Sequence, residues 1–139
     1  MTMIIKMLRE HESVESHAYK CTANKITIGV GRNIDPNGGI GLSDDEIDYL
    51  LANDIKRVNS ELLGAFSWYK TVSPPRKDAM IDICFNLGLP RLNKFKNALA
   101  AMAMGDYNKA AIEFLDSKWA KQVGQRAITI TDIIRSGEY

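Results

Sequence analysis

The sequence contains little cysteine, almost no net charge and no long hydrophobic run. Its two cysteines, Cys21 and Cys84, form no CxxC pair, which argues against a disulfide framework. Eighteen basic and seventeen acidic side chains leave a net charge of +1, so no field of the whole protein favours nucleic acid or an anionic membrane. No apolar stretch approaches the roughly 18 residues of a membrane-spanning helix, and the first ten residues lack the apolar core of a signal peptide. We therefore expect no nucleic-acid partner, no membrane insertion and no export by a signal peptide.

The charges that are present divide unevenly along the chain. Residues 1–69 hold seven basic and ten acidic side chains, and residues 70–139 hold eleven and seven. The surplus of positive charge in the second part weakly favours an anionic partner there. His11 and His17 could gather with the two cysteines around a metal, but the spacing matches no metal motif. We expect neither a metal nor a cofactor.

Most of the chain has the periodicity and end signals of amphipathic helices. Glu12 falls at the C-terminal edge of the first helix. Ser43 and Glu46 form a capping box at the start of the second helix, and Gly88 is placed to end the third. The sequence predicts helices over residues 2–12, 44–62, 73–88, 93–104, 106–118 and 125–136.

A short region between the first two helices has a different composition. Residues 25–31 alternate like a β-strand, residues 35–39 form a turn cluster, and five of the ten glycines lie between residues 29 and 41. This predicts two or three short strands. The fold class is therefore α+β, mostly helical, in a single domain of 139 residues.

Several ordered motifs together resemble the T-even-type phage lysozymes, the endolysins or muramidases of bacteriophages. They are residues 7–12, 19–22, 27–31, 85–88 and 117–119, followed by Arg126. The resemblance implies a two-lobed lysozyme-like fold, with a small antiparallel β lobe over about residues 14–42. It implies a helical lobe of residues 1–13 and 60–139, joined to the β lobe by a long helix over about residues 44–62, with a cleft between the lobes.

The most specific part of the resemblance is the spacing of Glu12, Cys21 and Thr27. It implies that Glu12 is the general acid that protonates the glycosidic oxygen of β-1,4-linked peptidoglycan, while Cys21 and Thr27 hold water on the opposite face of the sugar. A glutamate has to remain protonated for this role, so we expect burial of the helix end or a shaped cleft around it. A triad with one carboxylate favours inversion, although Asp35, Asp44 or Asp45 could supply a second one. Read without the family, these residues are a surface glutamate, a half-buried filler cysteine and a strand threonine.

The resemblance also assigns substrate-binding or supporting roles to Arg126, Phe85, Gly31 and Asn33. Arg126 is expected to pair with Glu12, or else to be a solvated arginine on a helix surface. Phe85 is either a sugar contact at the cleft or a core residue. Two further sugar-contact positions of the family fall on Ala98 and Glu113. Trp119 is expected in the core. Trp68 is either a core residue or a residue that stacks on a sugar ring.

Function and partners follow from the resemblance. We expect a monomeric hydrolase that is made in the host cytoplasm and acts in the periplasm on peptidoglycan strands at host lysis, after a holin-type protein permeabilises the membrane. Two other functions stay open at this point. One is a lytic transglycosylase that uses Glu12, and the other is a peptidoglycan-binding or baseplate module without turnover.

Overall fold

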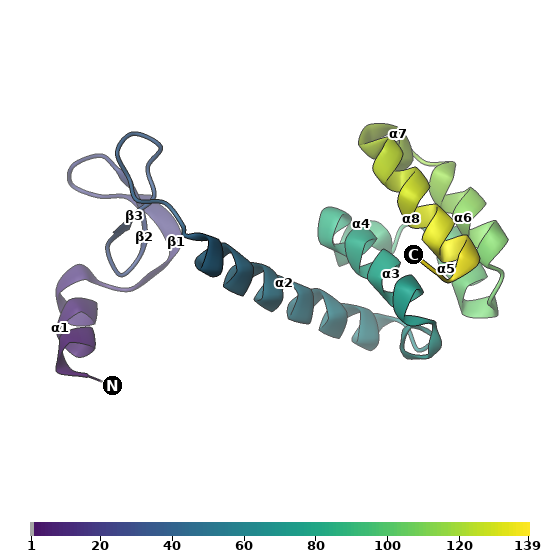
Figure 1. The fold of residues 1–139 in the computed structure, drawn as a ribbon, viewed down its shortest axis with the longest axis horizontal. Helices are drawn as coiled ribbons and strands as arrows, with labels where there is room; N and C mark the ends of the chain where they lie inside the picture. Colours follow the sequence, from purple (N-terminus) through teal and green to yellow (C-terminus); the bar gives the residue numbers. More distant parts are fainter. Residues whose placement is uncertain (1) are drawn as a thin grey trace. The chain divides into compact units, whose positions relative to one another are not determined.

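A computed structural model describes residues 2–139, and the chain divides into two compact units, residues 1–50 and 51–139. Figure 1 follows the elements in chain order. The first unit contains α1 (Met3–Glu12), β1 (Glu15–Lys20), β2 (Ile26–Gly29), β3 (Arg32–Asn33) and the start of α2 (Asp44–Ala65). The remaining helices belong to the second unit, and together these elements confirm the expected α+β class with a predominance of helix. Across residues 2–139, no helix combines the length and the hydropathy that a bilayer span requires.

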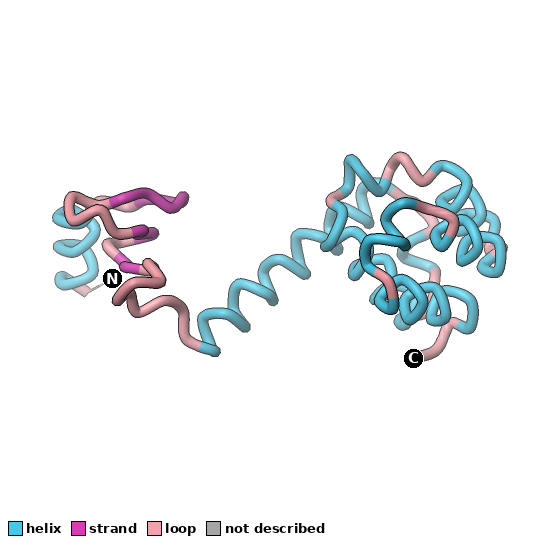
Figure 2. The backbone as a smooth tube through the Cα atoms, turned by 90° about the horizontal axis from the view of Figure 1, so that it is seen from above, coloured by secondary structure: helices cyan, strands magenta, loops and turns pink. Residues whose placement is uncertain are grey.

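The sheet of the first unit is a three-stranded antiparallel meander in the order β1-β2-β3, drawn in magenta in Figure 2. Thr27 lies at its centre, because it pairs with Tyr19 on one side and with Asn33 on the other. The predicted strand over residues 25–31 is confirmed in a shorter form, since β2 ends at Gly29. The sheet is too small to bury much: Thr27 is its one buried residue in β2, and β1 has none.

An ion pair ties the sheet to the start of α2. The Arg32 guanidinium contacts both carboxylate oxygens of Glu46, at 2.9 Å each, and donates to the Gly41 carbonyl at 3.0 Å. The Ser43 backbone N–H and hydroxyl also donate to the Glu46 carboxylate, at 3.0 and 2.8 Å. The predicted capping box at Ser43 and Glu46 is therefore confirmed, and Glu46 also forms the ion pair with Arg32.

The second unit is entirely helical, and its helices begin and end largely where the sequence predicts. The Ser73 hydroxyl caps α3, Gly88 ends it, and the helix predicted over residues 125–136 has those bounds. The elements after α2 are a 3₁₀ turn at Tyr69–Thr71, α3 (Pro74–Leu87), α4 (Leu89–Leu92), α5 (Lys96–Met104), α6 (Tyr107–Leu115), α7 (Lys118–Val123) and α8 (Gln125–Ser136).

Three of the predicted helix boundaries are wrong by three residues. The helix predicted over residues 44–62 continues to Ala65. The helix predicted over residues 93–104 starts only at Lys96, because residues 89–92 form the separate turn of α4 and Phe95 leaves the helical conformation. The helix predicted over residues 106–118 ends at Leu115. Ser117 is extended, and its hydroxyl accepts a hydrogen bond from the Ala120 N–H, so that a new helix, α7, begins at Lys118.

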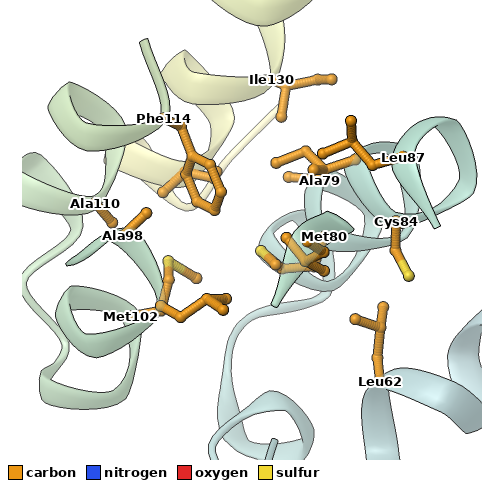
Figure 3. Packing of buried hydrophobic residues seen from close by; sticks show 14 of the residues in the cluster. Leu62, Ala79, Met80, Cys84, Leu87, Ala98, Met102, Ala110, Phe114 and Ile130 are labelled. Atoms are coloured by element: carbon orange, nitrogen blue, oxygen red, sulfur yellow. The ribbon is translucent and has the colours of Figure 1, made fainter. Parts of the chain in front are cut away.

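The core of the second unit forms where the apolar faces of α3, α5, α6 and α8 meet (Figure 3). Met80, Ile83 and Phe114 are fully buried in it. Each such side chain contributes about 1.5–3 kcal/mol relative to an exposed position. Trp119 is buried as predicted, and its indole N–H donates to the Asn86 side chain at 2.8 Å. Trp68 is partly buried and stacks on Phe66, with ring centroids 5.2 Å apart.

Arg76, near the start of α3, fastens the C-terminal end of α8. Its guanidinium donates to the Ile134 carbonyl at 2.7 Å and to the Arg135 carbonyl at 3.1 Å. It also lies over the Tyr107 ring, 3.5 Å from the centroid. The last carbonyls of a helix have no partner within the helix, so this arginine satisfies groups that would otherwise depend on water.

Candidate active site

Glu12 is the last residue of α1, as the sequence predicts, and its carboxylate lies against the backbone of Gly31. A Cβ atom at Gly31 would lie only 2.7 Å from Glu12 Oε2, and Gly31 has a φ of +68°. Only glycine fits this turn between β2 and β3 without displacing the carboxylate. The structure thus brings together two of the predicted site residues, Glu12 and Gly31.

The expected burial of this helix end is not observed. Glu12 is exposed, and no residue of α1 is buried. The physical reason within residues 1–50 is the size of the sheet, which has too few large side chains to cover a helix. The apolar face of α1, formed by Met3, Ile4, Met7 and Leu8, is correspondingly exposed.

Ser13 turns the chain directly after Glu12. Its φ of 60° and ψ of 168° fall in a region that residues other than glycine rarely adopt. This sharp turn ends α1 at Glu12 and directs the chain into β1, so that the meander returns its β2–β3 turn to the glutamate. Sequence periodicity does not reveal this conformation, because serine carries no signal for it.

Cys21 and Thr27 come together across the tight turn that joins β1 to β2. The turn is closed by the Cys21 N–H, which donates to the Lys25 carbonyl at 3.0 Å, and by the Asn24 N–H, which donates to the Cys21 carbonyl at 2.8 Å. Backbone N–H groups at Lys25 and Ala23 hold the pKa of the half-buried Cys21 thiol below its ordinary value. Hydrogen bonds to the charged form favour the thiolate.

The Thr27 hydroxyl hydrogen has a defined partner in the structure. It donates to the Lys25 carbonyl at 2.9 Å, and the residue is only 4% exposed. Its oxygen therefore keeps its lone pairs available to accept a hydrogen bond from water. The threonine is buried and oriented, which the strand pattern alone did not require.

The two cysteines are both free, and they differ in environment. Cys84 is buried in the helical core, and burial raises the pKa of its thiol to about 11. A thiol of this kind stays protonated near neutral pH and packs as a small apolar group. Cys21, in contrast, is half-buried, and its pKa is lowered.

Asn33 lies opposite Thr27 in the sheet, and its side chain is used within its own loop. Its side-chain oxygen accepts a hydrogen bond from the Asp35 N–H at 2.9 Å. The Asp35 carboxylate in turn accepts from the N–H groups of Ile26 and Asn37, at 3.0 and 2.8 Å. These bonds connect Asn33 and Asp35 within the loop after β3, and they occupy the carboxylate of Asp35, one of the candidate second carboxylates; the supporting role of Asn33 stays a prediction.

The second unit brings Phe85 and Arg126 together. Both line a hollow of about 410 Å³, whose apolar wall includes Leu51, Ile55 and Ile81. Phe85 is 44% exposed, so it is not a core residue. Its aromatic face is available to a ligand, and the role of sugar contact remains a prediction.

Arg126 binds a carboxylate that the sequence analysis did not single out. Its Nε and Nη2 both donate to Oδ1 of Asp82 on α3, at 2.8 and 2.6 Å. The two residues are 44 positions apart, and no local pattern connects them. The pairing of Arg126 with Glu12 stays a prediction.

Comparisons with known proteins bear on the identity of this site. The family model described as phage lysozyme matches residues 9–132, which include Glu12, Cys21, Thr27 and Arg126. The chain belongs to the phage lysozyme family. Membership makes it a muramidase-type glycoside hydrolase, a lysozyme-type enzyme of peptidoglycan, as the motifs predicted.

Individual relatives agree with this family. An endolysin of Acyrthosiphon pisum secondary endosymbiont phage 1 is 27% identical over 115 residues, covering 83% of this chain and 75% of the relative. A probable T4-type lysozyme 2 of Dictyostelium discoideum is 24% identical, covering 94% of this chain and 92% of the relative. The pre-baseplate central spike protein Gp5 of Enterobacteria phage T4 is 30% identical over 78% of this chain, but the match covers only 19% of that longer protein.

Proposed function

We propose that this phage lysozyme family member hydrolyses the β-1,4 bond between N-acetylmuramic acid and N-acetylglucosamine with inversion. Glu12 is the general acid, and Cys21 and Thr27 position the attacking water. The observation that carries the proposal is the turn from Cys21 to Lys25, which sets an oriented hydroxyl beside a thiol whose pKa is lowered by backbone N–H groups. Such a pair binds and polarises one water molecule.

The chemical step uses these groups in a balanced way. Glu12 gives its proton to the glycosidic oxygen as the bond from that oxygen to the muramic acid C1 breaks. Water bonds to C1 from the opposite face of the ring and passes a proton to the Cys21 thiolate, which later releases it to solvent. Glu12 then regains a proton from solvent. Because water attacks directly, the configuration at C1 inverts.

The choice of thiolate over thiol follows from the surroundings of the sulfur. A free thiol near pKa 8.5 is only a few per cent ionised at pH 7. The N–H groups of Lys25 and Ala23 increase that fraction for Cys21. The lowered pKa favours Cys21 as the base, and Thr27 fixes the water by accepting one of its hydrogens.

Product analysis tests the proposal. Purified wild-type protein is incubated with cell-wall sacculi, and the released glycan ends are identified by mass spectrometry, with the first anomer formed followed by NMR. Hydrolysis with inversion gives reducing muramic acid ends in the α configuration. Anhydro-muramic ends would identify a lytic transglycosylase instead. Glu12→Gln should abolish turnover and leave the unfolding temperature unchanged.

The similarity to the baseplate spike protein supports a second candidate function, in which the chain is a wall-binding or baseplate module. Tight binding to sacculi without release of any glycan ends by the wild type would favour it. The similarity to an endolysin supports the first candidate. In that role we propose a monomer, made in the host cytoplasm, that reaches the periplasmic wall after a holin-type protein permeabilises the membrane.

A further inference from the structure

The peptide group between Lys25 and Ile26 connects the candidate water-binding residues to a carboxylate on another loop. Its carbonyl oxygen accepts hydrogen bonds from the Thr27 hydroxyl at 2.9 Å and from the Cys21 N–H at 3.0 Å. Its N–H, on Ile26, donates to Oδ2 of Asp35 at 3.0 Å. A peptide group is planar and stiff, so a force on its N–H end also moves its carbonyl end.

The half-buried Asp35 side chain continues the edge of the sheet where β3 stops. β3 ends at Asn33, and the Ile34 N–H still donates to the Ile26 carbonyl at 2.9 Å. The Asp35 carboxylate then accepts the Ile26 N–H, and the N–H groups of Ile26 and Asn37 hold the pKa of Asp35 below its ordinary value. Asp35 is therefore charged near neutral pH, and a hydrogen bond to a charged acceptor is roughly twice as strong as one to a neutral acceptor.

The carboxylate is held in place by bonds of its own loop. The Gly39 N–H donates to the Asp35 carbonyl at 2.9 Å, and the Asp35 N–H donates to Asn33 Oδ1 at 2.9 Å. A Cβ atom at Gly39 would lie 2.5 Å from the Asp35 backbone, so only glycine allows this close approach. Lys25 Nζ also donates to the Asn37 carbonyl at 2.9 Å, which ties this loop to the turn between β1 and β2.

A charge at the N–H end of a peptide group affects its carbonyl end. The Asp35 carboxylate polarises the peptide, and the Lys25 carbonyl becomes a stronger hydrogen-bond acceptor. The Thr27 hydroxyl hydrogen is directed at this carbonyl, which leaves the Thr27 oxygen to accept a hydrogen from water. Loss of the Asp35 bond would therefore loosen the group that orients the hydroxyl.

We propose that Asp35 is a positioning residue for the hydrolytic reaction, and that it acts through the Lys25–Ile26 peptide to fix the Thr27 hydroxyl that holds the attacking water. This inference rests on the proposed function, which gives Thr27 that role. It also assigns Asp35, one of the candidate second carboxylates, to the support of the water and not to attack on the sugar.

The kinetic test compares the full-length wild type with Asp35→Ala, Asp35→Asn and the control Asp48→Asn on soluble, un-crosslinked glycan strands. Asp48 is an exposed residue of α2 in the same unit and forms no ion pair among residues 2–139. We expect Asp35→Ala to lower kcat by about tenfold and to change KM by less than twofold, because the position of the water matters in the transition state and not in sugar binding. Asp35→Asn keeps one acceptor oxygen, so its kcat should lie between those of Asp35→Ala and the wild type. Asp48→Asn should match the wild type.

Three kinetic outcomes would overturn the proposal. An unchanged kcat in Asp35→Ala would show that the peptide needs no carboxylate. A rise in KM without a fall in kcat would place Asp35 in substrate binding. An equal fall in kcat for Asp48→Asn would show an effect of net charge alone.

A double variant tests whether Asp35 acts through Thr27. Thr27→Val has no hydroxyl to orient, so Asp35→Ala should lower kcat further by less than about twofold in that background. The slow rates are measured as single turnovers at high protein concentration. A further loss as large as in the wild type would show that Asp35 acts elsewhere and would overturn the proposal.

Hydrogen exchange reports on the peptide without any turnover. The Cys21 N–H donates to the same Lys25 carbonyl as the Thr27 hydroxyl. Its exchange, followed by NMR, should be about tenfold faster in Asp35→Ala and unchanged in Asp48→Asn. Thermal melts verify that both variants are folded at the temperature of the measurement. Unchanged exchange in Asp35→Ala would overturn the proposal even if kcat falls.

The inference and the proposed function fail separately. Release of reducing ends by the wild type, with the same kcat in Asp35→Ala, would refute the role of Asp35 and leave hydrolysis intact. The absence of any released ends with the wild type would refute hydrolysis. In that case the exchange of the Cys21 N–H still shows whether Asp35 holds the peptide.

Discussion

Replacing Gly31 by alanine should separate the position of Glu12 from the stability of the fold. The new Cβ would lie 2.7 Å from Glu12 Oε2, and ordinary contact begins at 3.4 Å, so the carboxylate has to move by about 0.7 Å. Misplacement of a catalytic group by about 1 Å can cost a hundredfold in rate. We expect Gly31→Ala to lower kcat by between about tenfold and a hundredfold.

Gly29→Ala is the matched control for this prediction. Gly29 has a φ of +70°, almost the same as that of Gly31, but a Cβ there would meet no atom within 4 Å. Alanine at either position costs about 1–2 kcal/mol in backbone strain. Both variants should therefore lose similar free energy of unfolding in urea, while only Gly31→Ala loses activity on sacculi. Equal activity of the two variants would refute the reasoning that Gly31 seats the catalytic carboxylate.

Three other predictions follow from single interactions. Cys21→Asp should keep much of the activity and Cys21→Ser should lose most of it, measured as release of glycan ends from sacculi; full activity of Cys21→Ala would show that the thiol is idle. The pKa of Glu46 is about 2 in the folded chain, against an ordinary value of 4.5, so the stability that its ion pair contributes is complete above pH 4.5 and is lost as the pH falls toward 2. The melting temperature should therefore fall more steeply with decreasing pH in the wild type than in Glu46→Gln. An equal pH dependence of the two melting temperatures would contradict the assignment. Arg76→Ala should lower the free energy of unfolding by about 2–3 kcal/mol, because two carbonyls at the end of α8 and the Tyr107 ring lose their partner; a loss below about 0.5 kcal/mol would show that water replaces the guanidinium.

Local signals in the sequence were sufficient for most helix ends. The capping box at Ser43 and the glycine at position 88 act through hydrogen bonds within a few residues, so they can be read from neighbouring letters. The errors arose where one apolar pattern runs through a short break. The interruption at Phe95 depends on backbone angles for which phenylalanine has no particular preference. Ser117, in contrast, is a typical N-cap residue that could have been recognised in the sequence.

The candidate site was predictable only through the spacing of its members. Residue type alone predicts that Glu12 is an ordinary surface glutamate and that Thr27 is an ordinary strand threonine. The structure adds what spacing cannot supply: the contact of Glu12 with Gly31, the hydroxyl of Thr27 oriented by Lys25, and the N–H groups around the Cys21 sulfur. The Asp82 partner of Arg126 comes from a distant helix, and such pairs cannot be inferred from one sequence.

The clamp between Arg32 and Glu46 has a mechanical consequence for the acid. Arg32 directly follows Gly31, which lies against the carboxylate of Glu12. Because Arg32 is ion-paired with Glu46, the backbone next to Glu12 is connected to the first turn of α2. Protonation of Glu46 should therefore release the β2–β3 turn from α2, and with it the position of the carboxylate of Glu12.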